Sequence, residues 1–205
     1  MKLERQEIVR TALRLLDEVG LDGLSLRRLA RELGVQAPAL YWHFASKQEL
    51  LDAMVTMIAR EGYGPDAPEP GQSWDDWLAG RARAMRSRFL AHRDAARLAA
   101  GTRPTADRAP AIEGMVRALC DAGFTPGEAL LNILAVTDYV GGAVLEEQAG
   151  GGRDDGGIGP LDGAPAGQPT LQAAVAEMRD PDDRFEYGLS LLLDGMRARL
   201  AARSR

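Results

Sequence analysis

Apolar residues recur every three to four positions along most of the chain, which is the repeat of an α-helix with one buried face. The first such series is Ile8, Ala12, Leu15, Leu16 and Val19, and Gly20 directly after it supplies a stop. No segment alternates apolar and polar residues with the period of two that is typical of a half-buried strand. The pattern therefore predicts an all-α fold.

Capping residues and helix breakers divide this pattern into separate helices. Ser25 can cap a short helix that ends at Gly34, and Pro38 suits the first turn of the next helix. Two capping boxes, each a Ser or Thr followed three residues later by Glu, begin at Ser46 and Thr125. The later helices are predicted at 46–58, 73–90, 110–123, 125–148, 171–179 and 182–202.

Three segments rich in Gly, Pro and polar residues separate these helices. Residues 62–72 and 101–105 are predicted to be connectors, and 149–169 should be mobile because they are too rich in Gly, Pro and Asp to pack. A short helix, a turn at Gly34 and a third helix predict a helix-turn-helix. We therefore expect a three-helix head at 1–47 and a larger helical body at 48–205.

The third helix concentrates aromatic side chains in a chain that has only 5% Phe, Trp and Tyr. Spacing places Leu40 and Phe44 on one face, where they can pack in the head, and leaves Tyr41 and Trp42 on other faces. One interpretation is that all of these rings belong to the core. The other is that Tyr41, Trp42 and His43 lie against the sugar–phosphate edge of a DNA groove. Spacing alone leaves both open.

Charge is distributed in a way that fits a DNA-binding head. The net charge of −5 argues against a nucleic-acid partner, but residues 1–47 hold eight Lys or Arg against six Asp or Glu. Cys120 is the single cysteine, so an internal disulfide is ruled out. The sequence shows no membrane-spanning run of apolar residues and no signal peptide, so we expect a cytoplasmic protein.

Motifs for catalysis are not found in this sequence. His43 and His92 are the only histidines, and neither belongs to a recognisable catalytic spacing. There is no Gly-rich phosphate loop, HExxH, CxxC or GxSxG motif. We expect a protein that is not an enzyme and that uses no cofactor and no metal.

Several stretches of the sequence resemble one family of bacterial regulators. LDGLSLRRLARELGVQAPALYWHFASKQELLDAM resembles the DNA-binding head of the tetracycline-repressor (TetR) family. QSWDDWL, LAHRDAARLAAGTRPT, LCDAGFTPGEAL and VLEEQ resemble the body in the tetracycline-repressor branch, at nearly gapless spacing to about residue 148. The resemblance implies a dimeric regulator, by family default a repressor, that leaves a palindromic operator when a small effector binds.

The resemblance also implies which residues contact double-stranded DNA. Arg27 matches a reader of a guanine edge, and Lys47 matches a phosphate contact at the start of the fourth helix. Ala37 replaces a glutamine and cannot make a bidentate bond to adenine, so the operator should differ there. The residues implicated in DNA binding are Arg27, Gln36, Ala37, Pro38, Tyr41, Trp42, His43 and Lys47.

The implied effector site keeps some residues of the branch and changes others. The segment 102–104 matches a loop that moves when the effector binds, and Glu146 matches a carboxylate that reaches magnesium through water. Ala99, however, stands where a histidine coordinates the metal. The implicated positions are Tyr63, Arg81, Met85, Thr102, Arg103, Pro104, Met115, Asp138 and Glu146.

These changes predict a polycyclic or aromatic effector other than magnesium–tetracycline, bound near a buried pair of Arg81 and Asp138. Two alternatives stay open: a tetracycline-responsive repressor, and an all-α ligand-binding protein that does not bind DNA. Ala37 favours the latter slightly, whereas Arg27 and Lys47 argue against it.

The resemblance further implies that the long helix at 126–148 and the last helix form a homodimer. The last helix carries one wide apolar stripe, which has burial within the same chain as its alternative interpretation. Gly141 and Gly142 lower the stability of the long helix, which suggests close approach of a partner helix or a ligand. The stripe comprises Phe185, Leu189, Leu192, Leu193, Met196 and Leu200.

Overall fold

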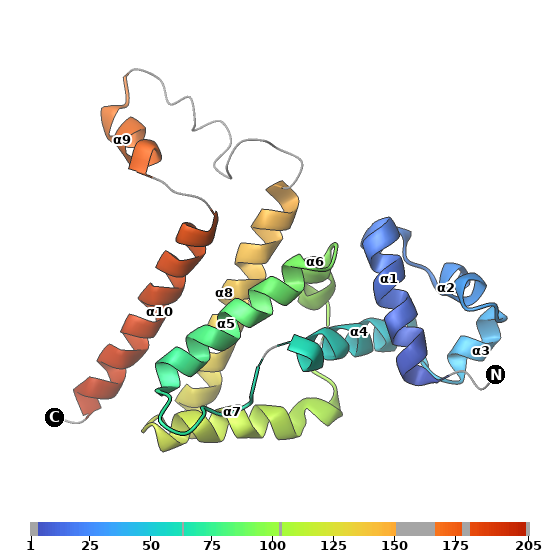
Figure 1. The fold of residues 1–205 in the computed structure, drawn as a ribbon, viewed down its shortest axis with the longest axis horizontal. Coiled ribbons are helices and arrows are strands. Elements are labelled where there is room, and N and C mark those ends of the chain that lie inside the picture. Colours follow the sequence, from blue (N-terminus) through green and yellow to red (C-terminus); the bar gives the residue numbers. More distant parts are fainter. Residues whose placement is uncertain (1–3, 63, 103, 151–166, 178–180, 204–205) are drawn as a thin grey trace.

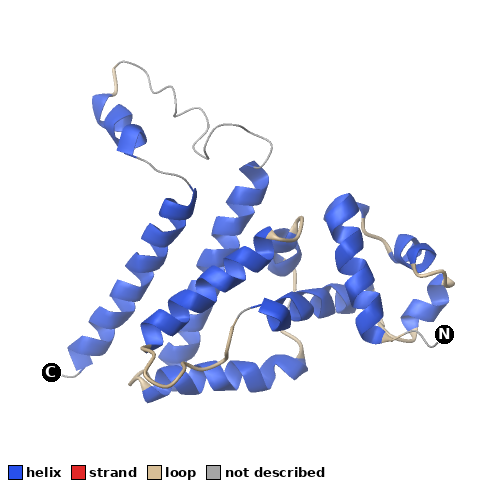
Figure 2. Cartoon of the chain, in the orientation of Figure 1, coloured by secondary structure: helices blue, strands red, loops and turns tan. Residues whose placement is uncertain are grey.

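The structure is a computed structural model that describes residues 4–62, 64–102, 104–150, 167–177 and 181–203. Within these ranges the chain forms helices, turns and loops and no strand (Figure 2), so the prediction of an all-α fold is confirmed. The elements are α1 (Arg5–Gly23), α2 (Leu26–Glu32), α3 (Ala37–Tyr41), α4 (Lys47–Gly62), α5 (Trp74–Leu90), α6 (Ala95–Ala100), the 3-10 turn η1 (Ala106–Arg108), α7 (Ala109–Asp121), α8 (Pro126–Gly150), α9 (Pro169–Glu177) and α10 (Pro181–Arg203).

The helices form a small head and a larger body. Helices α1, α2 and α3 lie together at one end, and α4 runs from them into the body (Figure 1). Helix α4 packs on α1 on the head side and on α5 and α6 on the body side. Helix α8 forms the centre of the body, where it contacts α5, α6, α7 and α10. Movement of the body can therefore reach the head through α4.

The predicted capping boxes fix the starts of two long helices. The Ser46 hydroxyl accepts the N–H of Glu49 at 3.1 Å, and the Glu49 carboxylate accepts the N–H of Ala45 at 2.7 Å. Thr125 and Glu128 make the same reciprocal pair before α8, at 3.4 and 3.0 Å. Each box satisfies one backbone N–H in the first turn of its helix and one just before that helix begins.

One helix end and one whole helix differ from those predicted. The backbone breaks at Gly20 as expected, with φ of +71°, but one further helical turn carries α1 to Gly23. Helix α6 was not predicted at all. It is only six residues long, and Ala95, Ala96 and Leu98 are buried. Isolated helices of this length are unstable, so packing against α8 rather than local sequence accounts for α6.

The long helix α8 is apolar on two opposite sides. One side is buried in the body through Ala129, Ile133, Val136, Val140 and Val144. The other side exposes Leu130, Leu131, Leu134 and Leu145. By length and composition alone, α8 is the one helix in the described ranges that could cross a membrane. In this structure 22% of its most apolar stretch is buried. Packing within the single chain therefore does not account for these exposed leucines.

The apolar stripe of α10 packs inside its own chain. Phe185, Leu189, Leu193 and Met196 are buried, and Leu192 and Leu200 are partly buried against the same core. The stripe therefore follows the alternative interpretation of burial within the same chain. The pairing of α8 and α10 with a second copy stays a prediction. Helix α10 contacts α5 and α8 of the same chain. The large apolar side chains that α10 exposes are Tyr187 and Leu191.

Most of the predicted mobile segment 149–169 lies outside the described residues. Helix α8 ends at Gly150 and α9 begins at Pro169, which agrees with the predicted ends of that segment within two residues. Two ion pairs of one half-enclosed arginine join the end of α8 to the start of α10. Arg86 of α5 donates two hydrogen bonds of 2.8 Å to Glu147 near the end of α8 and one of 2.6 Å to Asp182 at the start of α10.

Candidate nucleic-acid interface and effector site

The turn between α2 and α3 is built by backbone geometry that its sequence favours. Ser25 caps α2 by accepting the N–H of Arg28 at 3.2 Å. Gly34 adopts a φ of +66°, which glycine tolerates without strain. The N–H of Val35 then reaches back to the carbonyl of Ala30 at 2.9 Å. Pro38 occupies the first turn of α3, as predicted. These contacts give a helix-turn-helix.

The aromatic residues of this head divide between core and surface. Leu40 and Phe44 are each 1% exposed and pack in the core of the head, as their spacing predicts. Tyr41 is 57% exposed and Trp42 is 90% exposed, so the interpretation that all the rings are core is wrong. His43 is half-buried. Such exposure of an indole is unusual unless something covers it.

An arginine from α1 fixes the turn that follows these aromatics. Arg5 bonds the carbonyl of His43, makes an ion pair of 3.0 Å with Glu49, and places its guanidinium 4.1 Å from the centre of the Phe44 ring. The N–H of Ala45, and secondly Arg5, hold the pKa of Glu49 below its usual value. The start of α4 is thus tied to α1 and to the aromatic turn.

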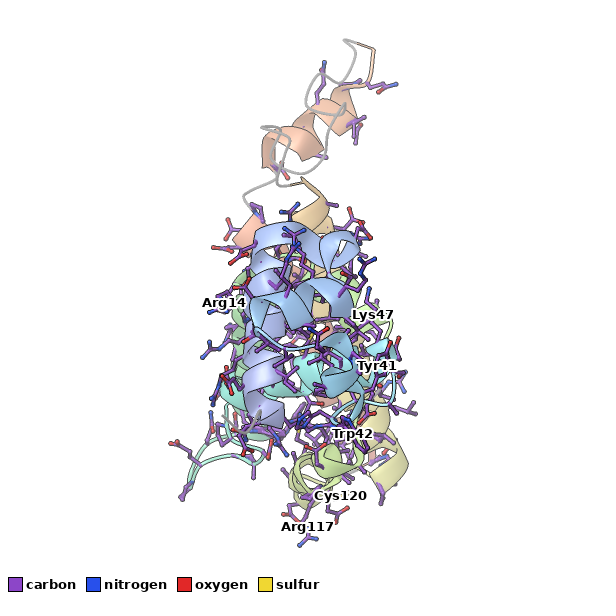
Figure 3. The ribbon with its side chains drawn as sticks, turned by 90° about the vertical axis from the view of Figure 1, so that its right-hand side faces the viewer. Arg14, Tyr41, Trp42, Lys47, Arg117 and Cys120 are labelled. Carbon is purple, nitrogen blue, oxygen red and sulfur yellow. The ribbon has the colours of Figure 1, made fainter. Side chains whose placement is uncertain are left out.

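The other predicted DNA contacts surround this turn on the outside of the head. Arg27, Gln36, Pro38 and Lys47 are exposed, and Ala37 is half-buried. Lys47, Tyr41 and Trp42 lie along one side of the head when it is viewed end-on, away from Arg14 (Figure 3). Cationic side chains and exposed rings of this kind can bond phosphate oxygens and pack on sugars.

The described residues of the predicted effector site do not lie together in the single chain. Arg81, Met85 and Met115 are buried inside the body. Asp138 and Glu146 are exposed on α8, on the side of the exposed leucines. Thr102 is half-buried and bonds the carbonyl of Ala99 at 3.0 Å, whereas Pro104 is exposed. The remaining two, Tyr63 and Arg103, lie outside the described residues.

The predicted buried pair of Arg81 and Asp138 is wrong. Arg81 instead bonds the carbonyls of Gly64 and Pro65 at 3.0 and 2.5 Å and pairs with Asp66 at 3.3 Å. Arg81 therefore holds the connector between α4 and α5 against the body. The sequence could not show this, because every residue type has a backbone carbonyl that can accept a hydrogen bond from an arginine.

Two sets of contacts that hold α4 and the end of α1 against residues 92–107 of the body were not predicted. Helix α4 touches the segment after α6 through three links: Gln48 to the carbonyl of Gly101 at 3.0 Å, Thr56 to Thr105 at 2.9 Å, and Arg60 to Asp107 at 2.6 Å. Gly101 lies just before the predicted moving loop at 102–104, and Thr105 and Asp107 lie just after it. The GTRPT sequence allowed the loop to be predicted, but no feature of the sequence indicated which residues of α4 it contacts.

The second set joins the end of α1 to the corner between α5 and α6. Asp17 accepts the N–H of Arg93 at 3.1 Å and a bond from His92 at 3.1 Å, so His92 has the structural role at a helix end that is common for histidine. Asp94 accepts the N–H of Leu21 at 2.8 Å. A Cβ on Gly20 would lie 2.8 Å from the Asp94 carboxylate, so this approach requires glycine.

Together, the exposed helix-turn-helix and the helical body define a ligand-responsive transcriptional regulator. Residues 8–54 match the model for bacterial regulatory proteins of the tetR family, and residues 67–200 match the tetracyclin repressor-like C-terminal domain. The chain belongs to the TetR family.

Similar proteins include the tetracycline repressor protein class A from transposon 1721 of Escherichia coli, which is 42% identical over 97% of this chain and 92% of the relative. The structure of class A TetR in complex with 5a,6-anhydrotetracycline and magnesium has a TM-score of 0.74 at 38% identity, covering 96% of this chain and 99% of the other. ActR of Streptomyces coelicolor in complex with (S)-DNPA has a TM-score of 0.84 at 33% identity, covering 97% and 98%.

Proposed function

We propose that two copies of this chain bind a palindromic operator as a cytoplasmic, non-enzymatic repressor and release it when a polycyclic or aromatic effector other than magnesium–tetracycline binds the body. The observation that supports DNA binding is the exposure of Tyr41 and Trp42, which the core of the head does not need. An indole that is 90% exposed gains little from its own chain but can pack on a sugar–phosphate edge.

Arg27 and Lys47 have different roles in this proposal. Arg27, exposed on α2, reads a guanine edge, and Lys47 binds phosphate at the first turn of α4, where backbone N–H groups also favour an anion. Gln36, Ala37 and Pro38 face the major groove at the start of α3. Tyr41, Trp42 and His43 contact its edge.

The dimer forms through the exposed face of α8 together with Tyr187 and Leu191 of α10. Leu131 and Leu134 are 65% and 46% exposed, and a Cβ on Gly141 or Gly142 would meet nothing within 4 Å in this chain. A leucine stripe of this kind with two adjacent glycines suits close packing against the same helix of a second copy. Pairing there places Asp138 and Glu146 in the interface, within reach of the partner's body.

The effector acts by favouring one position of α4 over another. Met85 and Met115 provide an apolar lining, and the segment after Gly101 carries three contacts to α4. Movement of 102–104 on effector binding would shift these contacts and so change the separation of the two heads. The proposed domain boundary at 47 coincides with the start of α4, the helix that would transmit this movement to the head.

The residues present do not fit a magnesium–tetracycline complex. Ala99, half-buried on α6, offers no donor atom where the branch has a coordinating histidine. Arg81 adds a fixed positive charge to the same body interior. Relatives at similar identity are solved with different ligands, 5a,6-anhydrotetracycline and (S)-DNPA, so family membership alone does not select the effector.

The test of the DNA half is footprinting on the DNA upstream of the chain's own gene, followed by titration at several salt concentrations. We expect a palindrome with half-site centres about one helical turn apart and a steep loss of affinity between about 50 and 200 mM salt. Lys47→Ala should weaken all sequences alike and flatten the salt slope. Arg27→Ala should relax base preference at one position, at a cost of about 1–3 kcal/mol. Absent or salt-insensitive binding would favour a ligand-binding protein without DNA.

The test of the effector half uses tetracycline at up to about 100 µM with millimolar magnesium. A ligand at a hundred times its dissociation constant stabilises the folded protein by about 2.7 kcal/mol, so tight binding would be visible in a melting experiment. We expect neither a shift of the thermal midpoint nor release of operator DNA. A magnesium-dependent shift would instead establish a tetracycline-responsive repressor.

A further inference from the structure

A cavity of about 360 Å³ lies at the junction between head and body, separate from the buried Arg81, Met85 and Met115. Four residues of α1, five of α4 and two of the segment 105–107 line it. This junction cavity is therefore bounded by the head, by the helix that leaves the head, and by the segment that follows the predicted moving loop. Its volume falls within the range of small-molecule sites.

The lining of the junction cavity combines an apolar wall with an available cation. Val9, Ala53 and Met57 supply the wall. The guanidinium of Arg60 is engaged by Asp107 at 2.6 Å. Arg10, by contrast, makes no hydrogen bond or ion pair with any described residue. A guanidinium beside an apolar wall is suited to an organic anion, because the charge-assisted bond fixes one end and the wall covers the other.

Arg5 and Glu61 set further limits on the ligand. Arg5 lines the junction cavity but is held by Glu49 at 3.0 Å, so it adds little attraction for an anion. Glu61 also lines the cavity, and its negative charge disfavours anions of high charge there. The combination disfavours phosphates and dicarboxylates and favours a single negative charge.

We propose that the junction cavity is a second ligand site, for a small aromatic monocarboxylate whose carboxylate pairs with Arg10 and whose ring covers Val9, Ala53 and Met57. This ligand would contact α1, α4 and the 105–107 segment at once. The contacts of Thr56 with Thr105 and of Arg60 with Asp107 form part of the same wall. An occupant therefore stabilises the present position of the segment against α4.

The consequence for regulation rests on the proposed function. An effector in the body that displaces the segment from α4 would have to disrupt the filled junction cavity. The two ligands therefore oppose each other, and by linkage each lowers the affinity of the other by the same factor.

Binding is tested by calorimetric titration of phenylacetate into the full-length protein without DNA, with neutral phenylacetamide as the matched probe. We expect one phenylacetate per chain and at least about ten-fold weaker binding of phenylacetamide, since a charge-assisted bond is lost. Arg10→Gln should weaken phenylacetate about ten-fold, and Ala53→Phe, which fills the cavity, should abolish its binding. Arg117→Gln, on the surface of α7, is the control and should change nothing.

Two results would overturn the site: no binding at 20 mM phenylacetate, or binding that neither Arg10→Gln nor Ala53→Phe alters. Because Arg10 is exposed, its variant remains interpretable even if Ala53→Phe does not fold. Coupling is tested separately by amide hydrogen exchange with phenylacetate present. Slower exchange in α1, α4 and residues 104–109 is expected, and protection confined to α5, α7 and α8 would contradict it. Neither experiment requires operator DNA. A failure of the proposed DNA binding and a failure of the junction-cavity site would therefore be told apart.

Discussion

The head and the body use aromatic and charged side chains in opposite ways. In the head, Tyr41 and Trp42 project outward while Arg27 and Lys47 stand on the surface. In the body, Trp77 is 2% exposed and bonds a connector carbonyl at 2.9 Å, and Arg86 is enclosed by Glu147 and Asp182. Groups that are satisfied inside the chain stabilise the fold, whereas groups left outside are available to a partner.

The largest expected effect tests whether core and surface rings of the head have separate roles. Phe44→Ala should lower the free energy of unfolding of the head by about 3–5 kcal/mol, because a fully buried ring is replaced by a cavity. Denaturant unfolding followed by circular dichroism measures this. Trp42→Ala is the matched control, with a stability change within about 0.5 kcal/mol but weaker operator binding. Equal loss of stability in both variants would remove the distinction.

The second prediction concerns the apolar face that the body leaves exposed. Leu134→Glu should raise the dissociation constant of the dimer about 100-fold or more, because a two-fold interface contains the change twice and each copy costs at least about 1.4 kcal/mol. Analytical ultracentrifugation measures the dimer. Leu90→Glu, at a leucine of α5 with similar exposure, should leave assembly unchanged. A dimer that persists in Leu134→Glu would show that α8 is covered by something else.

The third prediction concerns the contact between α4 and the segment after α6. Thr56→Val removes the hydroxyl that meets Thr105 and should cost about 0.5–1.5 kcal/mol of stability. Operator affinity should stay within about two-fold, while the effector concentration needed for release should change. Thr137→Val removes a bond within α8 and serves as the control. An unchanged effector response in Thr56→Val would exclude this contact from the signal.

The smallest expected effect is a pH dependence at the start of α4, where Glu49 bonds Arg5 and Ala45 of the head. Because the folded-state pKa of Glu49 is lowered, its contribution to stability is present above pH of about 4.5 and is lost as pH falls below that value. Glu49→Gln should therefore lower the thermal midpoint at pH 6 and leave it closer to that of the original chain near pH 3. Glu113→Gln, on the surface of α7, is the control. A constant difference across this pH range would contradict the assigned role.

Sequence reasoning predicted those features that a few neighbouring residues determine. The capping boxes at Ser46 and Thr125, the break at Gly20 and the inward position of Phe44 are all confirmed. In each case the controlling interaction spans no more than four residues or follows directly from helical spacing. Family resemblance added candidate DNA contacts, which stay predictions although the structure leaves Arg27 and Lys47 accessible.

Features that depend on contacts between distant segments were missed or misassigned. Helix α6 exists because α8 buries it, and Arg81 turned to the connector rather than to Asp138. The stripe of α10 was correctly found to be apolar, but periodicity cannot show whether the same chain or another one covers it. The contacts of Thr56 with Thr105 and of Asp17 with His92 join segments about 50 and 75 residues apart, which no local pattern reveals.

The two apolar faces of α8 also govern how long a single copy of the chain can survive. A newly made chain can bury Val136 and Val140 by itself, but it exposes Leu131 and Leu134 to water. Under the proposed assembly, folding stability then rises with concentration, since the dimer draws folded chains out of the unfolding equilibrium. At very low copy number, isolated chains would be the form that cellular proteases remove first. The leucines of α8 would in this way set a lower limit to the amount of regulator that a cell can maintain.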